Sequence, residues 1–399
     1  MPISENILCF GRLIACVIAI GIQWPDLTCR ADVNANSVES FDVCPDGDCL
    51  LLPVTIERRQ YLFLVDTGSD CTAVDPKMTP ALPLLSKRER VNGGDKRPMC
   101  SLRDVCIGKA QLPVGTEAVQ IDLSEVRKVF GHDICGILGM PFLKTQVMEI
   151  DFDHGRLTFL KSAPDSAGSA FRLFLNRSER PMLSIDIAED ESIPFVVDTG
   201  FIGVGTAVNI RSGRFNLLYE QGLIELHKGN GRVVAAGGYR QSRRGWLSVL
   251  AFGDTTFSRI GVGESNESAL GLCFLSRHVA TFDFPNLQLY LKPGKRIAEA
   301  DRLDASGLHV WRSGINGVEI ASVDPDSPGT AAGLTTGDRI LKYDGKSVSS
   351  ISLFKLRTIL ATEGLRIKLE VQNPAGSREV VLHLIRPKIE ETKKALPNK

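Results

Sequence analysis

The stretch YLFLVDTGSD, residues Tyr61–Asp70, begins with an apolar run that leads into Asp66, and Thr67 and Gly68 follow this aspartate directly. Such a run is typical of a β-strand that enters a hydrophobic core. The same pattern returns as PFVVDTGF at Pro194–Phe201. Two strands of this kind raise the hypothesis that Asp66 and Asp198 belong to one site.

The chain contains an internal repeat. Asp66 and Asp198 are 132 residues apart, and the same offset separates the glycines of GILGMPFL and SALGLCFL and the aspartates of the strands that follow. The pairs that share it are Asp66 and Asp198, Gly139 and Gly271, and Asp151 and Asp283. A constant offset indicates two copies of one unit, which we place at residues 45–163 and 170–294.

Together these motifs resemble the aspartic proteases in their bilobal, single-chain form. The resemblance covers residues 45–294 and is carried by DTGS, DTGF, ILG and ALG. Each unit is closer in length to the retropepsin-like lobe than to a pepsin lobe. The implied fold is mainly β, with two homologous β-barrel lobes, of which each supplies one catalytic aspartate.

The resemblance implies an endopeptidase whose catalytic pair is Asp66 and Asp198. Two carboxylates about 3 Å apart cannot both ionise easily, so they share one proton. The ionised member takes a proton from a water molecule that attacks the peptide carbonyl, and the protonated member donates to the carbonyl oxygen. This chemistry needs no cofactor and no metal, and its substrate is a protein or peptide.

The resemblance also assigns residues that hold the two catalytic loops. The hydroxyls of Thr67 and Thr199 tie the loops together, and the glycines allow close backbone approach and direct amides at the carboxylates. We expect the hydroxyl of Ser69 to bond the outer oxygen of its carboxylate. The supporting residues are Thr67, Gly68, Ser69, Gly139, Thr199, Gly200 and Gly271.

Two features depart from the family pattern. Phe201 stands where the second loop would carry a hydroxyl, and no segment is clearly the flap that covers the site. The glycine-rich tips Asn92–Lys96 and Ala235–Tyr239 are both candidates, and each could equally be an ordinary hairpin turn.

The C-terminal region, residues 303–388, resembles a PDZ domain of the bacterial type, on GVEIASV, GTAAGL and GDRILKYDGKSV. PDZ domains bind an extended peptide at a sheet edge and capture its terminal carboxylate with backbone amides. By position, this carboxylate loop would consist of Gly307, Leu308, His309 and Val310. These residues could equally form a plain first strand. Residues 389–399 are expected to form a polar tail.

Residues 1–31 have the features of a targeting segment. The apolar run Leu13–Ile22 follows Arg12 and has the length of a signal-peptide core, and cleavage could follow Ala31. An uncleaved membrane anchor is the main alternative, and a buried N-terminal helix is the remaining one. A signal peptide or an anchor would place the protein in the periplasm or the extracellular space.

The cysteines favour an oxidising compartment. Cys44 and Cys49 bracket PDGD, and Cys100 and Cys106 bracket SLRDV, so we expect two small disulfide loops. The sequence has no Cys-x-x-Cys pair and no histidines at ligand spacing, and we therefore expect no zinc site.

Other functions find little support. Lys and Arg together number 47, as do Asp and Glu, so the formal net charge is zero and a nucleic-acid partner is not expected. No Gly-x-Ser-Gly-Gly motif of a serine protease occurs. The sequence thus predicts an exported aspartic endopeptidase in which one chain suffices for catalysis. The alternative is a catalytically inactive bilobal peptide-binding protein with a PDZ domain.

Overall fold

The computed structural model describes residues 36–385, except for 45–46, 80, 92–93, 113–114, 188–191, 228, 230, 236–237 and 314–316. The predicted leader at 1–31 and the polar tail at 389–399 lie outside the described residues. Within the described part, none of the helices has the length and hydropathy needed to cross a membrane.

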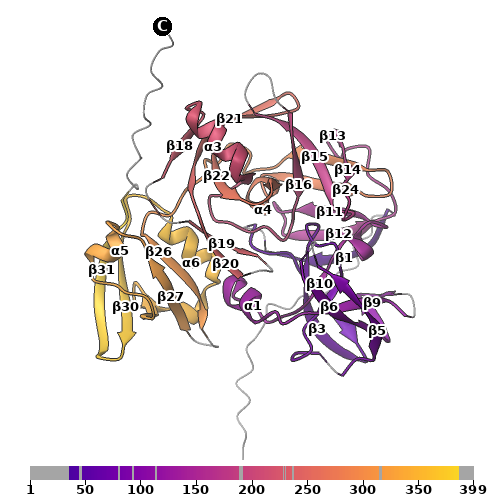
Figure 1. Ribbon diagram of the computed structural model, residues 1–399, viewed down its shortest axis with the longest axis horizontal. Coiled ribbons are helices and arrows are strands. Elements are labelled where there is room, and N and C mark those ends of the chain that lie inside the picture. The colour runs from indigo at the N-terminus through magenta and orange to yellow at the C-terminus, as the bar shows by residue number, and fades with distance from the viewer. Residues whose placement is uncertain are drawn as a thin grey trace, which may run out of the picture.

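The molecule is mainly β and has two lobes and a C-terminal PDZ domain (Figure 1). Lobe 1 is built on one mixed sheet. From edge to edge its strands are β5 (Leu84–Arg90), β6 (Lys96–Ser101), β9 (Glu117–Gln120), β4 (Ala73–Val74), β10 (Ile134–Leu138), β3 (Arg59–Val65), β2 (Leu51–Ile56), β7 (Val105–Ile107) and β8 (Ala110–Gln111).

Lobe 2 repeats this arrangement. Its sheet has the order β14 (Phe174–Leu175), β15 (Pro181–Asp186), β16 (Ser192–Val197), β23 (Ala269–Leu270), β17 (Val208–Arg211), β22 (Thr255–Ser265), β21 (Arg244–Phe252) and β18 (Ile224–Leu226). In lobe 1, β10 pairs parallel with β3 and antiparallel with β4, and in lobe 2, β23 pairs in the same way with β16 and β17. The internal repeat of the sequence is therefore a repeat of topology.

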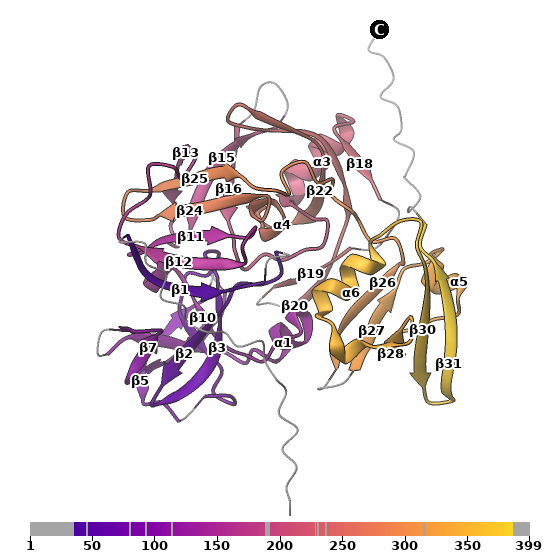
Figure 2. The same cartoon turned by 180° about the vertical axis from the view of Figure 1, so that it is seen from behind.

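A third sheet joins the lobes, and it faces the viewer in Figure 2. Its order is β1 (Ser37–Asp42), β12 (Arg156–Leu160), β11 (Val147–Asp151), β24 (His278–Asp283), β25 (Gln288–Pro293) and β13 (Ser169–Arg172). Strands β11 and β24 are antiparallel and place Glu149 opposite Thr281, with the Thr281 hydroxyl 3.4 Å from Glu149 Oε2 across 132 residues. An approximate two-fold axis thus passes between equivalent residues of the two copies.

The two lobes share one hydrophobic core, to which equivalent residues of each copy contribute. Phe63 and Phe195, at the centres of β3 and β16, are both fully buried. Phe152, which follows β11, is almost fully buried. Burial of such side chains stabilises the fold by roughly 1.5–3 kcal/mol each. The PDZ domain has a separate core.

Short helices complete the lobes: α1 (Ser124–Phe130), α2 (Met140–Leu143), α3 (Ser212–Glu220) and α4 (Leu272–Leu275). Helix α1 ends at Gly131, whose φ of 74° is the left-handed conformation that glycine adopts readily. Helices α2 and α4 follow Gly139 and Gly271 directly, so they occupy equivalent positions in the two lobes.

The PDZ sheet has the order β26 (Leu308–Ser313), β27 (Gly317–Val323), β28 (Arg339–Tyr343), β30 (Arg366–Asn373) and β31 (Gly376–His383), with β29 (Lys346–Ser347) beside β28. Its helical elements are α5 (Pro328–Ala331), η1 (Val348–Ser350) and α6 (Leu353–Leu360). Ser327 and Ser352 cap α5 and α6, because their hydroxyls accept from the amides of Thr330 and Lys355.

The PDZ domain packs against the lobes. Helix α1 of lobe 1 contacts β26, and Figures 1 and 2 both show it beside the domain. From α6, the guanidinium of Arg357 donates to the carbonyl of Val129 in α1 at 2.8 Å and to that of Val310 in β26 at 2.6 Å. The segment between β25 and β26, which links lobe 2 to the PDZ domain, is also held against lobe 2. Its buried Asp301 pairs with Arg277 and accepts from the Gly261 amide.

The two predicted disulfide loops are wrong. Cys49 and Cys106 carry free thiols, so neither Cys44–Cys49 nor Cys100–Cys106 is bridged. The thiol of Cys100 donates instead to the carbonyl of Ala118 on the neighbouring strand β9. Short spacing along the chain does not provide the side-chain geometry that a disulfide needs.

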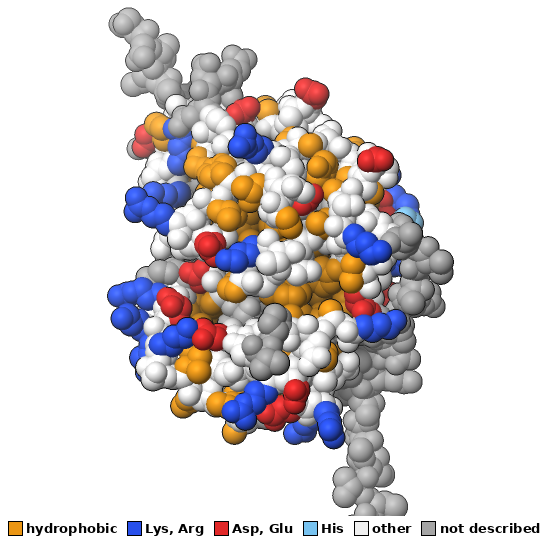
Figure 3. Space-filling view, turned by 90° about the vertical axis from the view of Figure 1, so that its right-hand side faces the viewer, with side chains coloured by type: hydrophobic (Ala, Val, Ile, Leu, Met, Phe, Trp, Pro, Cys, Tyr) orange, Lys and Arg blue, Asp and Glu red, His pale blue; other side chains and the backbone are white. Residues whose placement is uncertain are grey.

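Charges of both signs mix on the surface. Figure 3 shows one face, on which Lys and Arg lie among Asp and Glu and hydrophobic side chains gather across the middle. This mixture agrees with the zero formal charge. It gives this face no broad positive field that would attract a polyanion.

Candidate active site

Strands β3 and β16 carry the two aspartates to the boundary between the lobes. Val65 and Val197, their last residues, are fully buried, and Asp66 and Asp198 follow them in a half-buried position. The amide of Asp66 donates to Leu138 at 3.0 Å, and that of Asp198 donates to Leu270 at 2.9 Å. Each aspartate loop is thus held by a strand of its own lobe, β10 in lobe 1 and β23 in lobe 2.

Thr67 and Thr199 connect the loops by reciprocal hydrogen bonds. The amide of each threonine donates to the hydroxyl of the other, at 3.0 Å in both directions. Each hydroxyl also donates across the boundary, from Thr67 to the carbonyl of Val197 at 2.6 Å and from Thr199 to that of Val65 at 2.9 Å. Both threonines are fully buried, so these bonds fix the loops relative to each other.

Gly68 and Gly200 place each loop directly against the opposite carboxylate. A Cβ added to Gly68 would lie 2.4 Å from Cγ of Asp198, and one added to Gly200 would lie 2.4 Å from Cγ of Asp66. The amides of Gly68 and Gly200 donate at 2.8 Å to the Oδ1 atoms of Asp66 and Asp198. The two carboxylates therefore face each other across the lobe boundary in a space that any side chain would fill.

The expectation for Ser69 is wrong, because its hydroxyl donates to the carbonyl of Cys71 at 2.9 Å instead of to Asp66. In lobe 2 a backbone group replaces the missing hydroxyl, since the amide of Phe201 donates to Asp198 Oδ1 at 3.0 Å. Asp198 therefore accepts two backbone amides in these bonds, whereas Asp66 accepts the amide of Gly68.

Gly139 and Gly271 also mark close approaches. A Cβ at Gly139 would lie 2.0 Å from the carbonyl oxygen of Cys71, and one at Gly271 would lie 2.4 Å from the ring of Phe201. The Phe201 ring thus packs on the strand that supports Asp198. This contact explains how a bulky residue fits where lobe 1 has Ser69.

The electrostatics of the pair favour one shared proton. Burial raises the pKa of Asp66 well above its ordinary value, and the neighbouring charge of Asp198 raises it further. Burial also raises the pKa of Asp198, but the amides of Gly200 and Phe201 and a hydrogen bond from Asp66 lower it. Since backbone donors stabilise the charged form, Asp198 is the better site for the negative charge and Asp66 for the proton.

Arg180 is a functional candidate that the motifs did not reveal. It forms a two-pronged ion pair with Glu267, at 2.7 and 2.6 Å. Its Nη1 is 3.5 Å from the carbonyl of Gly68, and its charge lowers the pKa of both Asp66 and Asp198. Arg180 and Glu267 are 87 residues apart, and neither lies in a repeated motif.

Both flap candidates lie at hairpins. Strands β5 and β6 enclose the first tip, and β19 (Gly231–Ala235) and β20 (Gly238–Ser242) enclose the second. Residues 92–93 and 236–237 at these tips lie outside the described part of the chain. The role of either hairpin as a flap stays a prediction.

The residues predicted as a carboxylate loop mostly form the first PDZ strand, which was the alternative. Leu308, His309 and Val310 lie in β26, and the side chains of Leu308 and Val310 are buried. The amide of Gly307 is bonded to Asp304, and that of Leu308 to the Ser306 hydroxyl at 3.0 Å. These two amides therefore already have partners within the chain.

The model of the PDZ domain family matches residues 319–373, so the C-terminal region contains a PDZ domain. No curated protein matches the chain. Similar solved structures include an aspartic proteinase from Irpex lacteus, at 15% identity over 66% of this chain and 99% of that one, with a TM-score of 0.41. Another is a photosystem II D1 C-terminal processing protease, at 22% identity and a TM-score of 0.21, over 24% of this chain and only 26% of that one.

Proposed function

We propose that this protein is an aspartic endopeptidase that uses Asp66 and Asp198 as its catalytic pair. One observation carries the proposal: each carboxylate faces the glycine of the opposite loop, at 2.4 Å from the Cβ that any other residue would place there. The reciprocal threonine bonds hold this arrangement. Such a pair has the geometry for general acid–base hydrolysis of a peptide bond.

The asymmetry of the site suggests which aspartate plays which part. Asp198, with two amide donors, carries the negative charge and takes the proton from the attacking water. Asp66, whose pKa is raised further by the neighbouring charge, keeps the shared proton and donates it toward the carbonyl oxygen of the substrate. The intermediate is then a neutral diol, Asp198 holds the water proton and the negative charge is on Asp66. As the C–N bond breaks, Asp198 donates its proton to the leaving amine and Asp66 takes a proton back from the diol.

The PDZ domain supports a second point of contact with a peptide or protein partner. PDZ domains extend a sheet edge with the bound peptide. Here α1 packs against β26 at one edge of the PDZ sheet. We propose that a peptide could add to β26 only after α1 has moved. We also propose that the protein is exported, on the basis of residues 1–31.

The alternative is an inactive peptide-binding protein with the same lobes. A peptide library incubated with the protein, with and without a pepstatin-type inhibitor, separates the two. We expect cleavage of internal peptide bonds that the inhibitor abolishes. Binding of library peptides without cleavage, at any pH between acid and neutral, would contradict the proposal.

A further inference from the structure

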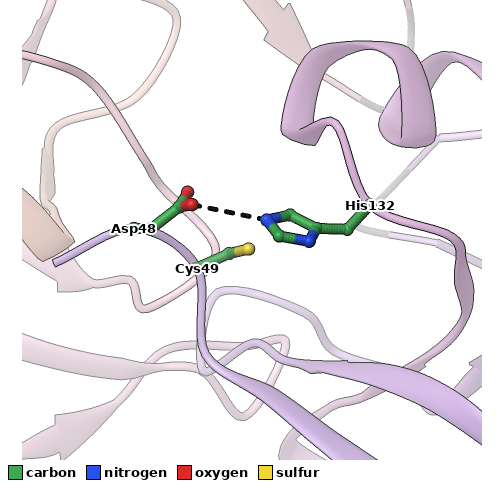
Figure 4. Close-up of side chains that lie close together, drawn as sticks. All are labelled: Asp48, Cys49 and His132. Carbon is green, nitrogen blue, oxygen red and sulfur yellow. Dashed lines mark hydrogen bonds and ion pairs between the residues drawn. The ribbon is translucent and has the colours of Figure 1, made fainter. Parts of the chain in front are cut away.

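Three metal-binding side chains meet in lobe 1, outside the catalytic pair. Asp48 and Cys49 lie on the segment that leads into β2, and His132 follows α1. One ligand atom from each lies within 4.8 Å of the other two. His132 Nε2 is 3.3 Å from Asp48 Oδ2, although 84 residues separate them in the chain. Figure 4 shows the carboxylate and the sulfur both directed toward the imidazole.

One oxygen of the Asp48 carboxylate is buried without a hydrogen-bond partner among the described residues. Asp48 is 2% exposed and Cys49 is 3% exposed, and Oδ1 of Asp48 has no hydrogen-bond partner among the described residues. A buried carboxylate oxygen without a donor or a cation costs free energy and calls for an explanation. The contact with His132 Nε2 involves the other oxygen, Oδ2, so it leaves Oδ1 unexplained.

We propose that Asp48, Cys49 and His132 bind one zinc ion. A thiolate, an imidazole and a carboxylate are the ligand types that zinc combines in tetrahedral sites. Bonds of about 2.0–2.3 Å in that geometry place ligand atoms roughly 3.3–3.8 Å apart. Since the three ligand atoms lie within 4.8 Å of one another, the widest pair needs to approach by about 1–1.5 Å at most. Calcium and magnesium prefer oxygen ligands alone, so the thiol selects against them.

A fourth ligand is available from two sources. Cys44 lies close enough to Cys49 for the charges of their sulfur atoms to interact. The side chain of His132 is 24% exposed, so a water molecule can also reach the ion. The sequence contains neither Cys-x-x-Cys nor paired histidines, because the ligands come from two distant segments, and the expectation of no metal rested on those patterns alone.

The ion would lie where three parts of the molecule meet. Gly47 is pressed against lobe 2, since a Cβ there would lie 2.7 Å from Ser276. Gly131 is pressed against the PDZ domain, since a Cβ there would lie 2.9 Å from that of Leu353. Zinc would join these two segments and fix α1 against β26. Its role is therefore structural, and metal binding adds its free energy to folding.

Zinc binding by the full chain tests this. The protein is purified with a reductant, stripped with a chelator, reloaded with zinc, and analysed for metal content and for affinity by competition with a chromophoric chelator. We expect one zinc per chain and a higher unfolding temperature with zinc than without it. Cobalt substitution should give the sulfur-to-metal charge-transfer absorption of a cobalt thiolate. Cys49→Ser should abolish this band if water is the fourth ligand and should weaken it if Cys44 is.

Matched variants identify the ligands. Cys49→Ser and His132→Gln should weaken zinc binding by more than the roughly tenfold that loss of an outer-shell partner costs. Cys106→Ser removes another free thiol of lobe 1, and His154→Gln removes another histidine paired with an aspartate, at 2.7 Å from Asp151. Both controls should bind zinc as the wild type does.

Three results would overturn the proposal. These are a zinc content far below one per chain in the wild type, equal affinity in Cys49→Ser and the controls, and a Cys44–Cys49 disulfide in the protein isolated without reductant. His132 is partly exposed, so His132→Gln should fold and give a result even if Cys49→Ser does not.

Discussion

The amide of Thr67 donates to the hydroxyl of Thr199 at 3.0 Å, and the amide of Thr199 donates to the hydroxyl of Thr67 at the same distance. These bonds join two loops that are 132 residues apart in the chain. The relationship is symmetric, as is the pairing of Glu149 with Thr281 in the sheet between the lobes. The candidate active site and the sheet thus share one approximate two-fold axis.

Thr199→Val should therefore reduce both stability and activity. Valine keeps the shape but leaves the buried amide of Thr67 without its acceptor, which costs about 1–3 kcal/mol. Chemical unfolding and kcat/KM would measure the two effects.

Thr158→Val is the matched control, because the buried Thr158 hydroxyl bonds that of Ser40 at 3.0 Å in the sheet between the lobes and makes no bond to the Asp66 or Asp198 loops. It should lower stability but leave kcat/KM unchanged. Equal activity in both variants would contradict a positioning role for Thr199.

Gly68→Ala should abolish cleavage. The new Cβ would lie 2.4 Å from Cγ of Asp198 and force the two carboxylates apart. Gly213→Ala in α3 is the control, because nothing lies within 4 Å of its Cβ position. That change should stabilise the helix by roughly 0.5–1 kcal/mol. Full activity of Gly68→Ala would show that the loops are not packed as described.

Arg180→Met should move the acid limb of the pH profile to higher pH. Burial raises the pKa of both Asp66 and Asp198, and the charge of Arg180 opposes that shift. Without this charge the pKa of the ionised member rises, so activity is lost at a higher pH as the solution is acidified. The measurement is kcat/KM against pH.

Arg177→Met, in the same turn but exposed, is the control for this variant and should keep the wild-type profile. An unmoved acid limb in Arg180→Met would mean that the arginine charge does not reach the pair. Ser69 gives no comparable effect on this limb, because its hydroxyl donates to the carbonyl of Cys71 and not to Asp66.

One chain should suffice for catalysis, because both carboxylates come from the same polypeptide. We expect activity per molecule to stay constant on dilution through the nanomolar range. Sedimentation at the same concentrations would report the oligomeric state. A steep loss of specific activity that coincides with dissociation would contradict this prediction.

The repeat made much of the fold predictable. A constant offset of 132 residues identifies equivalent positions, and equivalent positions that lie beside the two-fold axis meet, as Asp66 and Asp198 do. Other features depend on side-chain direction, which spacing does not encode. The Ser69 hydroxyl, the free thiol of Cys49 and the ion pair of Arg180 with Glu267 are examples. Contacts between domains, such as α1 on β26, leave no periodic signal at all.

The central claim is that Asp66 and Asp198 act as one catalytic pair, and asparagine variants test it most directly. Asp66→Asn and Asp198→Asn keep the shape of the carboxylate but cannot share a proton. Each should lose at least roughly 10²–10⁴-fold in kcat/KM and unfold at a temperature no lower than the wild type, since burial disfavours the charge that is removed. Asp186→Asn, at the exposed end of β15, should remain fully active. Wild-type activity in either folded variant would contradict the account.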